Sequence, residues 1–372
     1  MKIGISSTPL ESYHYGGNLD GIGVYTKQIA QGLIDLSQDV LLYSFPNFGS
    51  SKTNSGKALP YSYPIAELAG LVSGGRSKIK LDHDVDIYHA TDYKIVPMSC
   101  PVIATLYDSA PISNPEFANP RFRSLKNSVM KMSTTFADHI ITISEFSKSE
   151  IMKYYNIPES KVSIVPCGVD KKWLADINKT YVDSILEKRR LKSGYFLFVG
   201  TLQPRKNIEK IILAHKLLNK DFRQKHPLVL VGRKGWRCNS LVTLIMDEVS
   251  KGTVHWLNNV YDFNELKALY HGSSAFVFPS LYEGFGLPVL EAFATGLPVV
   301  TSNTSALPEV SNGIAIEVEP NSEQQISDAM YRIVVDDEER AWRINAGIIR
   351  AKELSWEETA IATLDVYKKV VT

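Results

Sequence analysis

The residues with the clearest chemical potential lie between Ser280 and Glu291, in the segment Ser-Leu-Tyr-Glu-Gly-Phe-Gly-Leu-Pro-Val-Leu-Glu. An apolar run, Ala275 to Pro279, precedes this segment and predicts a buried strand, and Pro288 predicts the start of a helix. A strand, a glycine loop and a helix in this order present unpaired backbone amides at the positive end of the helix, where anions bind. The segment therefore predicts an anion site.

Backbone amides and two carboxylates would form this site. Gly284 and Gly286 would let a ligand approach the backbone closely. The amides are those of Phe285, Gly286, Leu287 and Val289. Glu283 in the loop and Glu291 in the first helical turn only accept hydrogen bonds, and sugar hydroxyls can donate to them. The alternative is that Glu291 merely complements the helix dipole and the glycines merely form a turn.

Two adjacent cations, Arg205 and Lys206, follow another predicted strand, Tyr195 to Gly200. They stand where a helix begins, which opposes the helix dipole. A diphosphate there would receive charge-assisted hydrogen bonds from both side chains. The alternative is an ordinary surface pair, but the unfavourable position itself indicates an anionic ligand.

The composition narrows the class of protein. The chain has 372 residues with a net charge of +1, so it is long enough for two domains and lacks the basic excess of a nucleic-acid binder. Its three cysteines, Cys100, Cys167 and Cys238, fit neither a disulfide framework nor a metal knuckle. No apolar run approaches the ~20 residues of a membrane span, and the first residues enter a strand at once. We therefore expect a cytoplasmic protein.

Strand-like runs alternate with amphipathic helical stretches in both halves of the chain, which predicts an α/β fold of two Rossmann-like, doubly wound domains. We expect the first domain at residues 1–172, with 356–372 returning to it, and the second at 173–355. The predicted strands are 3–6, 40–44, 85–89, 102–106, 139–143 and 162–166, then 195–200, 228–232, 253–257, 275–279, 298–301 and 314–318.

A glycine loop containing Gly17 and Gly23 separates the first strand from the first helix and superficially imitates a dinucleotide fingerprint. The imitation fails because Thr26 replaces the last small residue and no acidic residue ends the second strand. We predict a loop that faces the ligand cleft and offers its helix start to a phosphate or an acceptor. The alternative is an ordinary surface loop.

Carboxylates occur at two further places in the first half. The segment from Asp82 to Asp86 resembles a metal-binding Asp-x-Asp, but it abuts a strand, so we predict a solvated strand entrance and no metal. Tyr107 and Asp108 follow the strand 102–106, at the edge where α/β sheets bind ligands. Asp108 could instead cap a turn.

A helix predicted around Phe122 has a hydrophobic stripe with basic residues beside it. Leu125, Val129, Met132 and Phe136 fall at helical spacing and predict a core-facing stripe. The basic residues Arg121, Arg123, Lys126 and Lys131 lie off that stripe. They indicate either a solvated face or a contact with anionic lipid.

The chain resembles the family-4 glycosyltransferases of the retaining GT-B class. The motifs that carry the resemblance are Glu283 and Glu291 with seven residues between them, Pro-Arg205-Lys206-Asn, Val165-Pro-Cys-Gly-Val-Asp, Ile143-Ser-Glu-Phe-Ser-Lys and Leu307-Pro-Glu-Val. The match is collinear from the first strand to the last helix. It implies two domains that face a central cleft, a donor held mostly by the second domain, and a last helix that crosses back to the first.

The resemblance also implies roles for particular residues. Arg205 and Lys206 would hold the donor diphosphate, Glu283 the donor sugar and Glu291 the ribose hydroxyls, while the amides from Gly284 to Leu287 line the sugar and phosphates. Many relatives have a histidine where this chain has Tyr107, next to the aspartate that matches Asp108. The role of that histidine is therefore not carried over.

The donor base is implied to pack in the segment from Trp256 to Asp262, which includes Val260. Asp262 could accept the two adjacent N–H donors of guanine, or it could cap the next helix, with Glu265 three residues later. We therefore expect a GDP-mannose donor.

These features together predict a retaining mannosyltransferase that builds surface polysaccharide such as O-antigen. It would use a nucleotide sugar and a saccharide or lipid-linked saccharide acceptor, without cofactor, metal or nucleic acid. Peripheral contact with the inner membrane is a further hypothesis, since many relatives use lipid-linked acceptors. The alternatives are a UDP-sugar transferase, a sugar-nucleotide epimerase and a non-catalytic nucleotide-sugar binding module.

Overall fold

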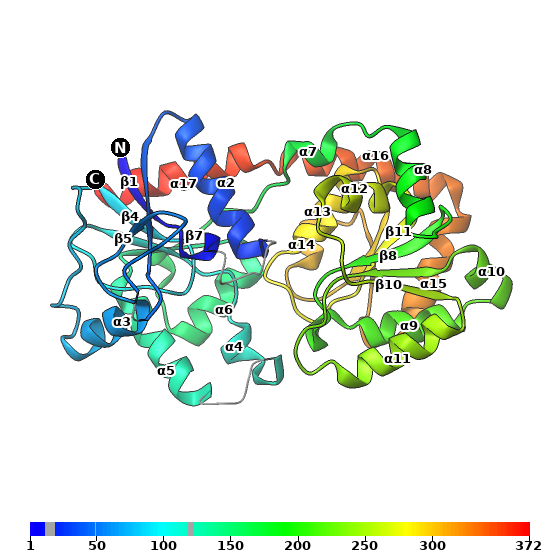
Figure 1. Ribbon diagram of the computed structural model, residues 1–372, viewed down its shortest axis with the longest axis horizontal. Coiled ribbons are helices and arrows are strands. Elements are labelled where there is room, and N and C mark those ends of the chain that lie inside the picture. The colour runs from blue at the N-terminus through cyan, green and yellow to red at the C-terminus, as the bar shows by residue number, and fades with distance from the viewer. Residues whose placement is uncertain (12–18, 49, 118–122) are drawn as a thin grey trace. The chain divides into compact units, whose positions relative to one another are not determined.

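The computed structural model describes residues 1–11, 19–48, 50–117 and 123–372. The chain forms two compact units (Figure 1). The first comprises Met1–Cys167 together with Trp356–Thr372, and the second comprises Gly168–Ser355. Each unit contains one parallel sheet, as the alternating pattern of strands and helices predicts.

The first unit has a seven-stranded sheet in the order β3-β2-β1-β4-β5-β6-β7, in which every neighbouring pair is parallel. Its strands are β1 (Lys2–Ser6), β2 (Asp39–Ser44), β3 (Lys57–Ala58), β4 (Ile87–Ala90), β5 (Val102–Thr105), β6 (His139–Thr142) and β7 (Val162–Ile164). Its helices are α2 (Gly21–Asp35), α3 (Tyr63–Val72), α4 (Ala110–Ser113), α5 (Arg123–Ser133), α6 (Glu145–Tyr155) and α17 (Trp356–Val371).

The second unit has a six-stranded parallel sheet in the order β10-β9-β8-β11-β12-β13. Its strands are β8 (Tyr195–Val199), β9 (Leu228–Val231), β10 (Val254–Leu257), β11 (Ser273–Phe278), β12 (Val299–Ser302) and β13 (Ile316–Val318). Its helices are α7 (Lys171–Leu174), α8 (Lys179–Lys188), α9 (Ile208–Leu217), α10 (Lys220–Lys225), α11 (Asn239–Ser250), α12 (Phe263–His271), α13 (Leu287–Ala294), α14 (Leu307–Ser311), α15 (Glu323–Val335) and α16 (Asp337–Glu353).

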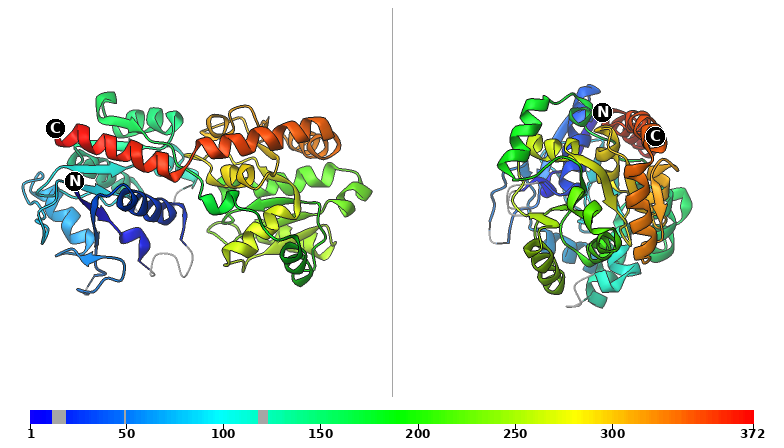
Figure 2. Two further views of the ribbon diagram at one scale, coloured as in Figure 1. Left: turned by 90° about the horizontal axis from the view of Figure 1, so that it is seen from above. Right: turned by 90° about the vertical axis from the view of Figure 1, so that its right-hand side faces the viewer.

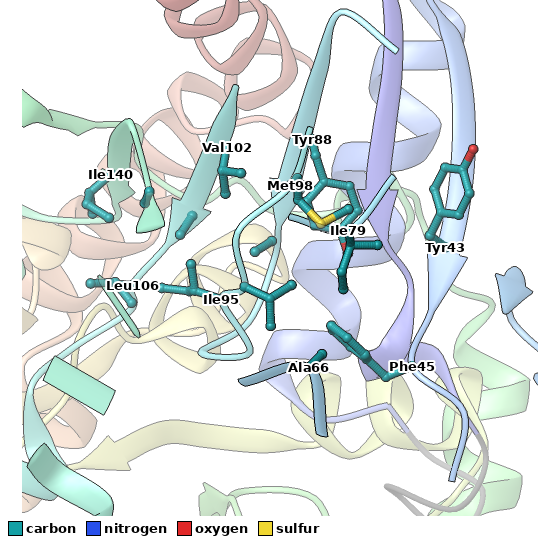
Figure 3. Packing of buried hydrophobic residues seen from close by; sticks show 14 of the residues in the cluster. Tyr43, Phe45, Ala66, Ile79, Tyr88, Ile95, Met98, Val102, Leu106 and Ile140 are labelled. Atoms are coloured by element: carbon teal, nitrogen blue, oxygen red, sulfur yellow. The ribbon is translucent and has the colours of Figure 1, made fainter. Parts of the chain in front are cut away.

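Both sheets are buried because helices flank parallel strands on each face. In the first unit, side chains from the sheet and from α3 form one hydrophobic cluster (Figure 3). Tyr88 and Val102 come from neighbouring strands, and Ala66 comes from α3. In the second unit every residue of β11 is buried, and its last four residues form an apolar run that leads to the predicted anion site.

The last helix, α17, belongs to the first unit although its sequence follows the second. It packs along α2 at a close approach where a Cβ atom on Gly32 would lie 2.6 Å from that of Ala360 (Figure 2). Tyr367 reaches the sheet, where its hydroxyl lies 2.6 Å from Nδ1 of the buried His89. The other ring nitrogen of His89 lies 2.7 Å from Thr105 Oγ1. Burial lowers the pKa of His89 to about 3, so the ring is neutral at physiological pH.

The predicted core stripe of the helix around Phe122 is wrong in part. Phe136 packs against the hydrophobic cluster and Val129 is half-buried, but Leu125 and Met132 are 64% and 48% exposed. The helix α5 ends at Ser133, before Phe136, and it contacts α3. Part of its apolar side therefore remains at the surface.

Candidate active site

The site forms where the strand order of the second sheet reverses. From β8 the chain continues to β9 and β10 on one side, and then returns to place β11 on the other side of β8. The loops that leave β8 and β11 at their carboxyl ends therefore diverge, which is where α/β sheets bind ligands. Arg205 and Lys206 lie in a 3-10 turn (Pro204–Lys206) after β8, and Glu283 lies in the loop after β11.

Glu283 forms ion pairs with both cations. Its Oε2 lies 2.6 Å from Arg205 Nη1, and its Oε1 lies 2.6 Å from Lys206 Nζ. The Glu283 side chain is 9% exposed, so the ion pairs are largely shielded from water. Lys206 Nζ also lies 4.7 Å from the centre of the Phe278 ring, a cation–π contact. The structure thus brings three predicted site residues together.

The pKa of the Glu283 carboxyl follows from these contacts. Burial alone would raise it, because the charged form loses its hydration. The charges of Arg205 and Lys206 and their hydrogen bonds outweigh burial and lower the pKa to about 2. Glu283 is therefore ionised throughout the physiological range.

Hydrogen bonds to backbone groups fix the loops around Glu283. The Leu281 amide donates to the Arg205 carbonyl at 2.8 Å, and Arg205 Nη1 donates to the Tyr282 carbonyl at 3.0 Å. The Glu283 amide donates to Ser305 Oγ at 3.1 Å. Ser305 has a φ of 57° and was not among the predicted site residues. Its only sequence signal is its place in a Ser/Thr/Asn-rich loop after β12.

Asn207 is a second residue that sequence reasoning left without a role. It has a left-handed φ of 58° and precedes α9. Its side-chain Nδ2 donates to the carbonyls of Pro279 at 3.0 Å and Pro320 at 2.7 Å. Asn207 thereby fixes the turn that carries the two cations against the end of β11. An asparagine directly after Arg-Lys is the signal that could have identified it.

The start of α13 has the predicted glycine geometry with one correction. Gly286 caps the helix with a φ of 121°, and a Cβ atom there would lie 2.7 Å from Leu307 Cδ2, so only glycine fits. The amide of Val289 was expected to be unpaired, but it donates to the Gly286 carbonyl at 2.9 Å. Of the four predicted donors, the amides of Phe285, Gly286 and Leu287 therefore remain candidates.

Glu291 is the fifth residue of α13 and so lies beyond the first turn, contrary to the prediction. It accepts a hydrogen bond from the hydroxyl of Tyr270 at 3.2 Å. Burial raises the pKa of Glu291 to about 7, only partly offset by the Tyr270 hydrogen bond. Tyr270, a fully buried residue of α12, was missed by sequence reasoning because nothing in its local pattern distinguishes it from core.

The segment expected to hold the donor base follows β10. Asp262 caps α12, and its Oδ1 accepts the Glu265 amide at 2.7 Å, so its capping role is observed. Val260 is half-buried in the preceding loop, and Asp262 is exposed. Contact with a base remains a prediction for both residues.

The candidates of the first unit have mainly structural partners. The Tyr107 hydroxyl is buried and donates to the Thr91 carbonyl at 2.6 Å, which favours a structural role for Tyr107. Asp108 Oδ1 accepts the Ala110 amide at 3.1 Å, the turn alternative already considered. Tyr107 and Asp108 belong to the first unit, whereas Glu283 belongs to the second. Catalytic roles for Tyr107 and Asp108 remain predictions.

The glycine loop departs from its predicted use. The amide of Gly23 already donates to Asp20 Oδ1 at 2.8 Å, so an anion at this helix start would meet a carboxylate. Gly23 is closely packed, since a Cβ atom there would lie 2.9 Å from Leu19 Cδ2 and that side chain would have to shift. Gly17 lies outside the described residues.

The acidic segment before β4 is tied into the fold. Asp82 Oδ1 accepts the Tyr43 hydroxyl at 2.8 Å, and Asp82 Oδ2 pairs with Lys57 at 2.9 Å. Asp86 accepts the Lys2 amide at 2.8 Å. Among the described residues, no group of three or more His, Cys, Asp or Glu side chains could hold a metal ion.

Two Rossmann-like parallel-sheet units, with a candidate anion site at the switch point of the second, are typical of the GT-B class of glycosyltransferases. Solved structures share the fold over almost the whole chain. Sucrose-phosphate synthase from Thermosynechococcus elongatus has a TM-score of 0.74 at 18% identity, covering 100% of this chain and 99% of that one. HepE from Anabaena, solved with UDP, has a TM-score of 0.76 at 15% identity, covering 99% and 100%.

The chain belongs to the family-4 glycosyltransferases. Residues 19–173 match the model described as Glycosyltransferase Family 4, and residues 184–350 match Glycosyl transferases group 1. O-antigen chain mannosyltransferase B of Escherichia coli is 33% identical over 289 residues, 77% of this chain and 75% of that protein. O-antigen chain mannosyltransferase RfbU of Salmonella typhimurium is 30% identical over 295 residues, with the same coverage. The chain is therefore a glycosyltransferase, as its sequence motifs predicted.

Proposed function

We propose that this glycosyltransferase moves mannose from GDP-mannose to a glycan or lipid-linked saccharide during synthesis of surface polysaccharide such as O-antigen. The observation that carries the proposal is the grouping of Arg205, Lys206 and Glu283 at the switch point of the second sheet. The names of the two O-antigen mannosyltransferases support the choice of mannose.

The proposed chemistry places the cations at the leaving group. In the transition state the sugar becomes oxocarbenium-like while negative charge grows on the departing diphosphate. Arg205, Lys206 and the amides from Gly284 to Leu287 would stabilise that growing charge. A leaving-phosphate oxygen would take the acceptor's proton, with retention of the anomeric configuration. Proton NMR of fresh product tests this step, and inversion would contradict it.

Two cations at the diphosphate would do the work that a metal does in other transferases. We therefore expect transfer to continue in EDTA. Activity that returns only when Mn²⁺ or Mg²⁺ is added would exclude this part of the proposal.

Asp262 is the residue proposed to recognise the guanine base. Asparagine caps helices as well as aspartate does, so Asp262→Asn separates base recognition from capping. The variant should lose about 1 to 3 kcal/mol of affinity for GDP and less for UDP, because an amide cannot accept both guanine N–H groups. Calorimetry in which the unmutated protein binds UDP as tightly as GDP would favour the alternative UDP-sugar donor.

A panel of sugar nucleotides tested for thermal stabilisation identifies the donor. We expect the largest increase in melting temperature with GDP-mannose. Incubation with donor alone tests the epimerase alternative, since an epimerase changes the donor without an acceptor.

A peripheral membrane contact is the second part of the proposal. None of the helices formed by the described residues has the length and apolar character to cross a bilayer. However, α3 and α5 contact each other and both expose apolar residues, namely Ile65, Leu68, Val72, Leu125 and Met132. Lys126 and Lys131 are exposed on α5. Arg121 lies outside the described residues, and the structure describes Arg123 only as the first residue of α5.

Liposome co-sedimentation tests this contact. Binding to anionic vesicles should weaken as salt rises, and Leu68→Ser with Val72→Ser should reduce it. Met246→Ser, which changes an exposed apolar residue of α11, is the matched control. Absence of binding at low ionic strength would leave a solvated face as the explanation of the cations.

A further inference from the structure

Glu283 forms ion pairs with Arg205 and Lys206, the two cations that would hold the donor's diphosphate in the proposed function. Each carboxylate oxygen is committed to one of them, at 2.6 Å from Arg205 Nη1 and 2.6 Å from Lys206 Nζ. We propose that Glu283 is an internal anion that the diphosphate of the donor displaces, and that it returns to the cations after sugar transfer and expels the nucleoside diphosphate. This inference rests on the proposed function.

The burial of Glu283 determines when it can leave the cations. Its side chain is only 9% exposed, and a buried carboxylate without hydrogen-bond donors is strongly unfavourable. Sugar hydroxyls are donors, so a sugar-bearing ligand replaces the bonds that Glu283 gives up. A nucleoside diphosphate without a sugar binds the two cations but offers no sugar hydroxyls to donate hydrogen bonds to Glu283. The site should therefore hold the donor and release the product.

The exchange needs only a change in side-chain torsions. The Glu283 backbone is fixed on both sides, because its amide donates to Ser305 Oγ at 3.1 Å and its carbonyl accepts the Ala306 amide at 3.3 Å. The opposite loop is tied to the same segment, since the Leu281 amide donates to the Arg205 carbonyl at 2.8 Å. Neither loop has to open for the carboxylate to turn.

The cations keep other contacts when Glu283 turns away. Arg205 Nη1 also donates to the Tyr282 carbonyl at 3.0 Å. Lys206 Nζ lies 4.7 Å from the centre of the Phe278 ring at the end of β11. These contacts hold both positive charges in place for the incoming diphosphate, so the site is organised before the donor arrives.

The inference is tested by whether a substitution of Glu283 strengthens or weakens the binding of diphosphate ligands. Glu283→Gln keeps the shape of the side chain and removes the competing charge, so it should tighten binding of inorganic pyrophosphate and of GDP at least tenfold. Affinity for GDP-mannose should rise less, because the variant also alters the acceptor of the sugar hydroxyls. Structural damage at the site would weaken all three ligands. Calorimetry on the purified full chain measures each value, with UDP and UDP-glucose run in parallel.

Asp247→Asn is the matched control. It makes the same change in net charge in the same unit, at an exposed ion pair with Lys251 near the end of α11. This end of the helix leads into the start of β10, at the sheet edge opposite the site. The control should leave affinity for pyrophosphate unchanged.

Unchanged or weaker binding of pyrophosphate and GDP by folded Glu283→Gln overturns the inference. If that variant fails to fold, the unmutated protein decides, since it should bind GDP-mannose more tightly than GDP, and the reverse order overturns the inference. If neither guanosine nor uridine nucleotides bind, the proposed function fails and the inference fails with it. If sugar nucleotides bind but the variant shows no tightening, only the inference fails.

Discussion

Removing the two cations affects both catalysis and folding. Arg205→Ala with Lys206→Ala should cost on the order of 2 to 4 kcal/mol of transition-state stabilisation, because the leaving diphosphate loses its charge-assisted contacts. It also leaves the buried charge of Glu283 without its ion-pair partners, which typically costs about 3 to 5 kcal/mol of stability. We therefore expect both a loss of turnover and a lower melting temperature.

A third substitution separates the two effects. Adding Glu283→Gln to the double variant should restore much of the lost stability but none of the activity. Chemical denaturation and a transfer assay on the same preparations measure both quantities. A double variant as stable as the unmutated chain would show that the ion pairs contribute little to folding.

Glu291 predicts a pH dependence of stability. Its pKa rises from 4.5 to about 7 on folding, so between these values the folded chain keeps a proton that the unfolded chain releases. The free energy of unfolding should therefore fall as pH rises through this range, by at most about 1.4 kcal/mol per pH unit, and level off above pH 7. Glu291→Gln should remove this contribution.

Denaturation curves of the two proteins from pH 4.5 to 8 give the difference directly. The variant should be as stable as the unmutated chain near pH 4.5 and more stable at pH 8. Parallel curves across the range would mean that Glu291 has an ordinary pKa.

At the level of single elements, the packing of α17 on α2 depends on Gly32. A Cβ atom at this position would lie 2.6 Å from that of Ala360, so Gly32→Ala should push the helices apart and cost about 1 to 3 kcal/mol, despite the better helix propensity of alanine. Gly21→Ala on the same helix is the control, because a Cβ atom there meets nothing within 4 Å. Thermal denaturation compares the two variants.

The compensating change sharpens this test. Ala360→Gly combined with Gly32→Ala relieves the contact between the two Cβ atoms and should recover part of the stability lost in Gly32→Ala. Equal losses for Gly32→Ala and Gly21→Ala would show that close helix packing is not responsible.

For the molecule as a whole, the C-terminal helix α17 stabilises the first unit, most of which is formed by Met1–Cys167. Deleting residues 356–372 removes the Tyr367 hydroxyl from the buried His89 and the Thr359 hydroxyl from the Pro166 carbonyl, at 2.6 and 2.9 Å. Amide hydrogen exchange should then quicken in β4, β5 and α2 and stay unchanged in β8 and β11, because α17 belongs to the first unit alone. Equal acceleration in both sheets would contradict this assignment.

Local sequence patterns predicted both sheets and the candidate site. The alternation of β-rich and amphipathic runs predicted both parallel sheets, because residues adjacent in sequence fix the period of strands and helices. The glycines, the acidic spacing around Glu283 and the pair Arg205 and Lys206 identified the candidate site, since each motif lies within one strand-to-helix junction.

Tertiary contacts determined how those motifs meet. Glu283 pairs with Arg205 and Lys206 across 78 and 77 positions, and this depends on β11 lying next to β8 in the sheet. The exposure of Leu125 and the burial of Tyr107 likewise depend on which neighbours cover them. Periodicity shows which side of an element is apolar, but only the packing of distant segments decides whether that side is buried and which charges become partners.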